Sequence, residues 1–203
     1  METTTFRQKM QIAREEAILE AVNTLLATKG FDLMTVDAVA AEAGIAKASL
    51  YRHFPSKEDL AAAAMMRMLD AALAQAAAQP EERAPLDKLK TMSRWAMATA
   101  LAGNMPSLPH ANSSLVTALS KHEGYLERVF RLSDEMGGWI LAAQEAGVLN
   151  PGLSPQLILF RLFANACDPV LHFMKATGQY SDEDIIAMML TTCFDGLTPP
   201  CAA

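Results

Sequence analysis

Apolar residues recur every three or four positions near the start of the chain, which is the spacing of one face of an α-helix. This pattern predicts a helix over residues 14–29, with Gly30 as its end. The buried face of this helix is predicted to be Ile18, Val22, Leu25 and Leu26.

Two shorter helices are predicted next, over residues 35–43 and 46–53. Thr35 is a suitable N-cap for the first, and Gly44 supplies the sharp turn between them. Pro55 ends the second, because a residue before proline avoids helical geometry. The inward-facing residues are predicted to be Val36, Val39, Ala40, Leu50 and Phe54. Two short helices around a glycine turn indicate a helix-turn-helix unit.

The rest of the chain is also predicted to be helical, because no useful stretch alternates as a strand does. Ser56 caps a fourth helix that reaches residue 79, and residues 80–85 contain two prolines and form a linker. Further helices are predicted over residues 86–104, 112–121, 125–146, 154–177 and 181–197. Pro169 is expected to kink one of them, since it removes a backbone hydrogen bond and crowds the preceding turn. The predicted fold class is all-α.

Composition and charge narrow the class of protein. The chain has 203 residues, 51% of them hydrophobic, which is enough for a core, and a net charge of −6. This excess of acid argues against general nucleic-acid affinity. However, the segment from Gly44 to Lys57 holds three cations and a histidine but no acid. A local basic surface on an acidic protein favours one defined docking face.

Cysteine usage and the amino terminus indicate a cytoplasmic protein. Cys167, Cys193 and Cys201 share no metal-binding spacing and are expected to be reduced thiols. The chain begins without the apolar stretch of a signal peptide, and we expect no membrane partner because no apolar run approaches the ~18 residues of a span. No cofactor is expected.

The helix-turn-helix segment resembles the TetR family of bacterial transcriptional repressors. The matching residues are Val39-Ala40, Ala43-Gly44-Ile45, the run Leu50-Tyr51-Arg52-His53-Phe54, and Ser56-Lys57-Glu58 followed by Leu60. The resemblance implies an N-terminal three-helix helix-turn-helix domain over residues 1–55 and a connecting helix over residues 56–79. It further implies a C-terminal helical bundle over residues 80–203 for ligand binding and dimerisation.

The resemblance also implies which residues contact operator DNA. Lys47, Ala48 and Tyr51 match positions that face bases, where a lysine can donate to guanine and an alanine can touch a thymine methyl. Positions that bind phosphates are matched by Ser49, Tyr51, Arg52, His53 and Lys57. Thr35 lies at the start of the helix over residues 35–43, where its hydroxyl and backbone N–H can bind a phosphate. Ala46 departs from the family, which usually has a hydroxyl residue capping the recognition helix at this position.

A sensing domain is expected to enclose a small, apolar effector. Aromatic residues, methionines and a few polar residues of the C-terminal part are the candidates, although such residues lie more often in a core than in a pocket. The predicted ligand-binding residues are Met92, Trp95, Met105, His110, Tyr125, Trp139, Phe163 and Asn165.

The last two predicted helices are apolar nearly all round and must be covered on both sides. The resemblance implies that they pair with a second copy as a homodimer, whereas the residues alone also allow the core of a monomeric bundle. The implied protein is a repressor that binds a pseudo-palindromic operator and is released by its effector.

Other functions remain open at the level of sequence. No nucleotide-binding, serine-hydrolase or zinc-protease motif is present, so an enzyme is not expected. A metal- or redox-responsive regulator and a helical adaptor that binds no DNA are the alternatives. The histidines lack ligand-like spacing, and no metal site is predicted.

Overall fold

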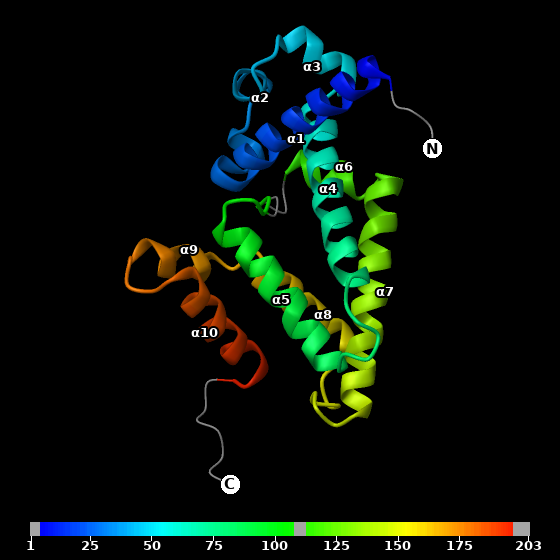
Figure 1. Cartoon of the computed structure of the whole chain (residues 1–203), viewed down its shortest axis with the longest axis vertical. Coiled ribbons are helices and arrows are strands. Elements are labelled where there is room, and N and C mark those ends of the chain that lie inside the picture. The colour runs from blue at the N-terminus through cyan, green and yellow to red at the C-terminus, as the bar shows by residue number, and fades with distance from the viewer. Residues whose placement is uncertain (1–4, 108–112, 197–203) are drawn as a thin grey trace. The chain divides into compact units, whose positions relative to one another are not determined.

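The computed structural model describes residues 5–107 and 113–196, which form ten α-helices and no strand (Figure 1). The helices are α1 (Phe6–Leu33), α2 (Val36–Glu42), α3 (Lys47–His53), α4 (Lys57–Ala77), α5 (Pro85–Leu101), α6 (Ser114–Leu119), α7 (Glu123–Glu145), α8 (Pro155–Asn165), α9 (Pro169–Ala176) and α10 (Asp182–Phe194). The prediction of an all-α fold with an N-terminal helix-turn-helix is confirmed.

The chain divides into two compact units. Unit 1 contains the described residues up to Leu69 together with those between Pro106 and Arg128, and unit 2 contains the others. Both α4 and α7 begin in unit 1 and end in unit 2. This division differs from the predicted one, because the segment after Pro106 packs with the amino-terminal helices.

Unit 1 has one apolar core, to which α1, α2, α3, α4 and α6 contribute. Most side chains predicted to face inward are buried there, Val36 and Phe54 are partly buried against them, and Leu115 and Leu119 of α6 join the core. Ser107 adds a polar contact to this unit, because its hydroxyl donates to the carbonyl of Leu26 over 2.7 Å. The helix-turn-helix therefore packs on α1, α4 and α6.

Helix α1 begins earlier than predicted and has a break near its end. Thr5 and Gln8 form a capping box, in which each side chain bonds the other's backbone N–H. Gly30 breaks the helical backbone with φ 72° and ψ 170°, a conformation that glycine tolerates. Phe31 follows the break and lies in the unit 1 core.

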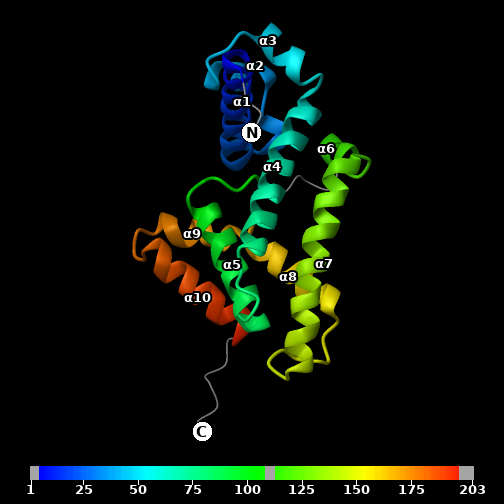
Figure 2. The ribbon, with the colours of Figure 1, turned by 45° about the vertical axis from the view of Figure 1, so that its right-hand side comes forward.

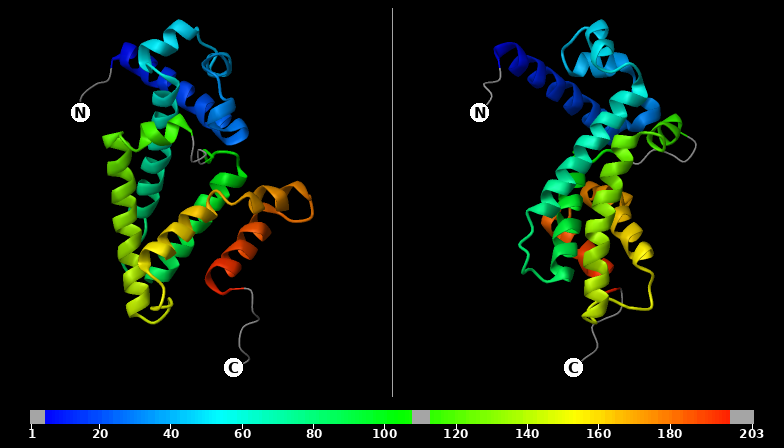
Figure 3. Two further views of the ribbon diagram at one scale, coloured as in Figure 1. Left: turned by 180° about the vertical axis from the view of Figure 1, so that it is seen from behind. Right: turned by 90° about the vertical axis from the view of Figure 1, so that its right-hand side faces the viewer.

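Unit 2 is a bundle in which α5 contacts α8, α9 and α10. Figure 2 shows α9 and α10 beside α5, and the rear view in Figure 3 shows α8 crossing α5. One buried cluster joins α5 to α9 and α10 and consists of Met97, Ala100, Leu101, Leu171, Ile185 and Ile186. Lys175 adds a polar link, because its ammonium donates to the carbonyl of Leu101 over 2.7 Å.

The predicted helix over residues 154–177 is in fact two helices, so the expected kink at Pro169 is wrong. Asp168 has an extended backbone and caps α9, with its carboxylate accepting from the N–H of Val170 over 2.9 Å. Pro169 is therefore the first residue of a new helix, a position at which its missing N–H costs nothing.

By length and composition, the stretches Lys57–Ala77 and Pro155–Ala176 would each be able to cross a membrane. Core helices of soluble proteins pass the same test. In this chain α4 contributes buried residues to the cores, among them Leu60, Ala64 and Ala76.

Candidate DNA-binding surface

The turn between α2 and α3 has the local structure that the sequence predicts. The Thr35 hydroxyl accepts from the N–H of Ala38 over 3.1 Å and caps α2. Gly44 adopts φ 65°, and the N–H of Ile45 then bonds the carbonyl of Ala40 over 3.0 Å. Ala46 precedes α3 without a side-chain cap, as its methyl group requires. The turn thus fixes the start of α3 through backbone bonds.

Helix α3 has a distinct inner and outer side. Successive residues are rotated by about 100° around a helix. On this wheel Lys47, Tyr51, Ala48 and Arg52 follow one another over about 140° and are all exposed. Leu50 is fully buried on the opposite side. Four of the predicted contact residues therefore share one exposed face.

Lys47 and Asp37 form an ion pair between α3 and α2. The Lys47 ammonium lies 2.8 Å from one Asp37 carboxylate oxygen and 2.9 Å from the other. Both side chains are largely exposed, at 48% and 72%. The hydrogen bond that Lys47 donates to Asp37 raises the pKa of Lys47, so the pair favours the charged ammonium. The carboxylate thus shares the exposed face with the cation predicted to read bases.

Two predicted phosphate contacts, Ser49 and His53, are directed into the domain. Ser49 is only 9% exposed, and its hydroxyl accepts from the Arg52 guanidinium over 3.1 Å. His53 lies on the side facing α1, with its Nδ1 atom 3.1 Å from a carboxylate oxygen of Glu15. Ser49 thus holds Arg52, and His53 joins α3 to α1. Neither residue lies on the exposed face.

The start of α4 provides a second polar edge. The Ser56 hydroxyl accepts from the N–H of Asp59 over 3.0 Å, which confirms the predicted cap. The Lys57 ammonium lies 4.2 Å from the centre of the Phe31 ring and 3.4 Å from the carbonyl oxygen of Asp32. Lys57 therefore sits at the helix start with no carboxylate among its bonded partners in the described chain.

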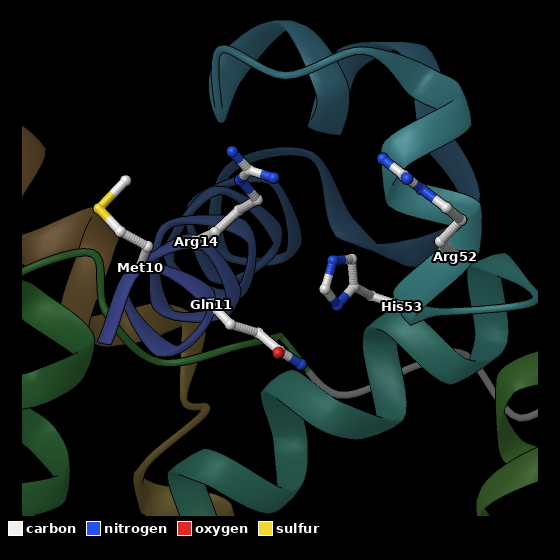
Figure 4. Close-up of a pocket in the computed structure, with 5 residues that line it drawn as sticks. All are labelled: Met10, Gln11, Arg14, Arg52 and His53. Atoms are coloured by element: carbon white, nitrogen blue, oxygen red, sulfur yellow. The ribbon is translucent and has the colours of Figure 1, made fainter. Parts of the chain in front are cut away.

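Sequence reasoning did not single out a pocket between α1 and α3. Its volume is about 430 Å³, and it is lined by Met10, Gln11, Arg14, Arg52 and His53 (Figure 4). The basic residues of α1 lie outside the recognised motif, so the motif offered no signal for them. Their position depends on how α1 packs beside α3.

The predicted ligand-binding residues do not all belong to one unit. Tyr125 packs against the core of unit 1, where burial raises its pKa. Asn165 is buried in unit 2, but its amide donates to the Cys193 sulfur over 2.9 Å. His110 lies outside the described residues, as does Cys201.

The other candidates lie in unit 2. Met92 is buried in α5, whereas Trp95, Met105 and Phe163 are half-buried. Trp139 lines a pocket of about 560 Å³ between the end of α4 and α7, with Lys88 5.7 Å from its ring centre. The remaining lining residues are Leu73, Ala76, Ala77, Arg131, Asp134, Glu135 and Gly138. This pocket is more polar than the predicted site.

No cluster of histidine, cysteine, aspartate or glutamate suited to a metal ion occurs within the ranges 5–107 and 113–196. Cys167 and Cys193 are thiols of intermediate exposure.

Comparison with known families identifies the amino-terminal domain. The family described as "Bacterial regulatory proteins, tetR family" matches residues 18–64. This range contains the whole of α2 and α3, the part of α1 from Ile18 onward and the beginning of α4. It therefore coincides with the surface described above.

Relatives and solved structures extend the similarity to the rest of the chain. The HTH-type transcriptional regulator TcmR of Streptomyces glaucescens is 26% identical over 75% of this chain and 69% of its own length. RutR of Escherichia coli K12 is 28% identical over 81% of this chain and 77% of its own. The crystal structure of AibR with isovaleryl coenzyme A and operator DNA aligns with a TM-score of 0.64, at 21% identity, over 89% of this chain and 98% of AibR. The chain therefore belongs to the TetR family of helix-turn-helix transcriptional regulators.

Proposed function

We propose that this regulator is a repressor that binds a pseudo-palindromic operator as a homodimer and releases it when a small apolar effector occupies unit 2. The observation that carries the proposal is the exposed face of α3, on which Lys47, Ala48, Tyr51 and Arg52 stand together. In a dimer, two such helices enter major grooves about 34–36 Å apart, or a multiple of that distance.

The proposed base contacts are made by Lys47, Ala48 and Tyr51. Arg52, Lys57 and the exposed N-terminus of α2 at Thr35 hold phosphates, because a helix start and a guanidinium both favour oxyanions. Ser49 and His53 support this surface from behind, since their polar atoms bond Arg52 and Glu15 respectively.

The proposed dimer interface is formed by α8, α9 and α10. Large apolar side chains are exposed to solvent on these helices, including Phe160, at 57%, and Phe173, at 69%. The stretch Pro155–Ala176 is apolar along its length, yet only 28% of its most apolar part is buried within the chain. An apolar surface of this kind needs a cover, and a second copy supplies an identical one.

The effector is proposed to bind within unit 2, among Met92, Trp95, Met105, Trp139 and Phe163. Effector binding weakens operator binding if the effector prefers a conformation that DNA does not. Helix α4 is the proposed link, because it begins at Lys57, shortly after α3, and ends in unit 2. Both tryptophans lie in unit 2, so their fluorescence reports effector binding.

Selection from a library of random duplexes tests the DNA-binding part. The purified protein is expected to enrich a sequence with two-fold related halves. Failure to enrich any sequence would refute operator recognition. On the enriched duplex, Tyr51→Ala and Lys57→Ala should weaken binding at least tenfold, whereas Arg67→Ala, which also removes a cation from α4 in unit 1, should not.

Sedimentation tests the dimer. Phe160→Asp and Phe173→Asp should convert the dimer to a monomer, because each buries a charge at the proposed contact. Phe130→Asp is the matched control, since Phe130 is 61% exposed on α7, outside the interface. A monomeric parent protein, or equal effects of all three changes, would refute this interface.

A fluorescence screen tests the effector. Acyl-CoA thioesters and the corresponding short carboxylic acids are the first compounds, because the acyl chain is a small apolar group and AibR binds isovaleryl coenzyme A. A compound that changes tryptophan fluorescence should also lower affinity for the enriched duplex. A compound that binds unit 2 and leaves DNA affinity unchanged would argue against regulation through α4.

A further inference from the structure

The pocket between α1 and α3 has a basic lining. Among the five lining side chains that the structure describes, three are Arg14, Arg52 and His53, and none of the five is acidic. Figure 4 shows Arg14 projecting from α1 and Arg52 and His53 projecting from α3 around the same opening. The pocket thus presents nitrogen donors from two helices to one volume of about 430 Å³.

The acid closest to this lining is engaged by the lining itself. One carboxylate oxygen of Glu15 lies 3.1 Å from His53 Nδ1 and accepts from the Gln11 amide over 3.3 Å. Glu15 is therefore tied to the pocket wall by two of the lining residues. It leaves the two guanidinium groups without a carboxylate.

The guanidinium groups have unused donors. In the described part of the chain, Arg14 has no hydrogen-bond or ion-pair partner, and Arg52 donates to the Ser49 hydroxyl. A guanidinium carries five N–H donors in a planar fork that matches the oxygens of a phosphate. Two such groups on one pocket form a site for an oxyanion.

The pocket also borders the proposed DNA-facing surface. Arg52 lies at the edge of the exposed face of α3, and the residue that follows it, His53, lies on the side that faces α1. An oxyanion in the pocket therefore lies beside the face that carries Lys47 and Tyr51. On a duplex, the anion adjacent to a base-reading helix is the backbone phosphate.

We propose that Arg14 and Arg52 jointly bind a backbone phosphate of the duplex, so that α1 positions the protein on DNA together with α3. This inference rests on the proposed function, because it adds a positioning residue, Arg14, to the same surface. The contact carries no sequence information of its own and sets the register of α3 in the groove.

The salt dependence of DNA affinity measures this contact. Each lost phosphate contact lowers the slope of log K against log salt by about 0.9, so Arg14→Gln should lower it by about 1.8 in a two-fold dimer. From 50 to 200 mM salt, the parent should consequently lose about tenfold more affinity than the variant. The loss should be similar on the enriched duplex and on an unrelated one.

Lys29→Gln is the matched control. Lys29 is an exposed cation of the same helix, about 22 Å further along its axis, and the variant has the same net charge. It should keep the parental slope, and Arg14→Lys should keep most of it. Circular dichroism should show all three variants folded, since Arg14 has no partner within the described chain.

The outcomes separate this inference from the proposed function. A parent that binds no duplex refutes DNA binding itself. A parent that binds, with equal slopes for the parent and Arg14→Gln, overturns the phosphate contact alone. Equal reductions in Arg14→Gln and Lys29→Gln also overturn it, because they indicate general charge. Saturable binding of inorganic phosphate at Arg14, with an unchanged DNA slope, assigns the pocket to a free anion and overturns it as well.

Discussion

The two sides of α3 allow a paired prediction with neighbouring residues. Leu50 is fully buried in the unit 1 core, whereas Tyr51 is 46% exposed on the opposite side. Leu50→Ala should therefore destabilise unit 1, and Tyr51→Ala should leave its stability nearly unchanged while weakening DNA binding. The pair separates a folding role from a recognition role within two adjacent positions.

The size of the Leu50 effect follows from its burial. The substitution removes three carbons, and each buried carbon contributes about 0.8 kcal/mol, which gives about 2.4 kcal/mol. The cavity left by a residue with no exposed surface adds to this loss, so the expected decrease in the free energy of unfolding is about 2.5–5 kcal/mol. Surface changes such as Tyr51→Ala usually stay within about 0.5 kcal/mol.

The placement of the tryptophans makes the assay specific. Trp95 and Trp139 both lie in unit 2, so tryptophan fluorescence follows that unit and not unit 1. Urea unfolding followed by circular dichroism should show a transition that Leu50→Ala shifts down by about 1–2 M. The fluorescence transition should shift less if the units unfold separately.

Two results would refute this reasoning. A circular dichroism transition that is unchanged in Leu50→Ala would show that the inner face of α3 does not support the core. A loss of stability in Tyr51→Ala as large as in Leu50→Ala would show that Tyr51 is not a surface residue. In either case the residues of the exposed face of α3 would have to be reassigned.

Two further predictions follow from ion and capping contacts. Asp37→Asn should tighten duplex binding several-fold, because it frees Lys47 and removes a carboxylate from the exposed face; Glu42→Gln, an equal change in charge on the same helix, should give a smaller gain in the same titration. Equal gains would show that the ion pair does not compete with DNA. Ser181→Ala should raise the pKa of Asp184, since the bonds from Ser181 hold that pKa below its ordinary value in the folded protein. A lowered carboxyl pKa stabilises the fold above the unfolded value, about 3.9, and this stabilisation is lost as pH falls through the folded value. Carboxyl NMR titration should thus find Asp184 protonated at higher pH in the variant, and an unchanged midpoint would exclude the capping bond as the cause.

Local patterns predicted the helix-turn-helix because each feature there has a local cause. Thr35 caps α2 and Gly44 takes a positive φ whatever the rest of the chain does. The same kind of local signal occurs at two other helix starts. Thr5 and Gln8 have the spacing of a capping box, and Asp168-Pro169 is a cap followed by a first helical residue. Both define helix starts that apolar periodicity alone does not reveal.

The positions of Ser49 and His53 were also open to prediction. With Leu50 buried, helical geometry places His53, three residues later, beside the same inner side. The family motif suggests phosphate contacts for both residues, and these stay predictions, whereas the structure shows that their polar atoms bond Arg52 and Glu15. The position of a residue on the helix therefore decides its surroundings more directly than its place in the motif.

Long-range packing accounts for what the sequence did not predict. Tyr125 belongs to unit 1 because the segment after Pro106 returns to the amino-terminal helices, and no local pattern marks that return. The pocket of Arg14 and Arg52 likewise joins residues 38 positions apart in the chain. Such sites become visible only when the angle between α1 and α3 is known.

The cations of unit 1 differ in the contacts within the chain that must break before they bind DNA. Lys47 bonds Asp37, Arg52 bonds Ser49, and Lys57 lies on the Phe31 ring. Each of these contacts has to be exchanged for a DNA contact, so their net contribution to affinity is reduced. Arg14 has no such partner within the described chain and contributes its full electrostatic attraction. On a chain with a net charge of −6, this arrangement favours weak binding to arbitrary duplexes and makes tight binding depend on a sequence that lets the exchanges occur together.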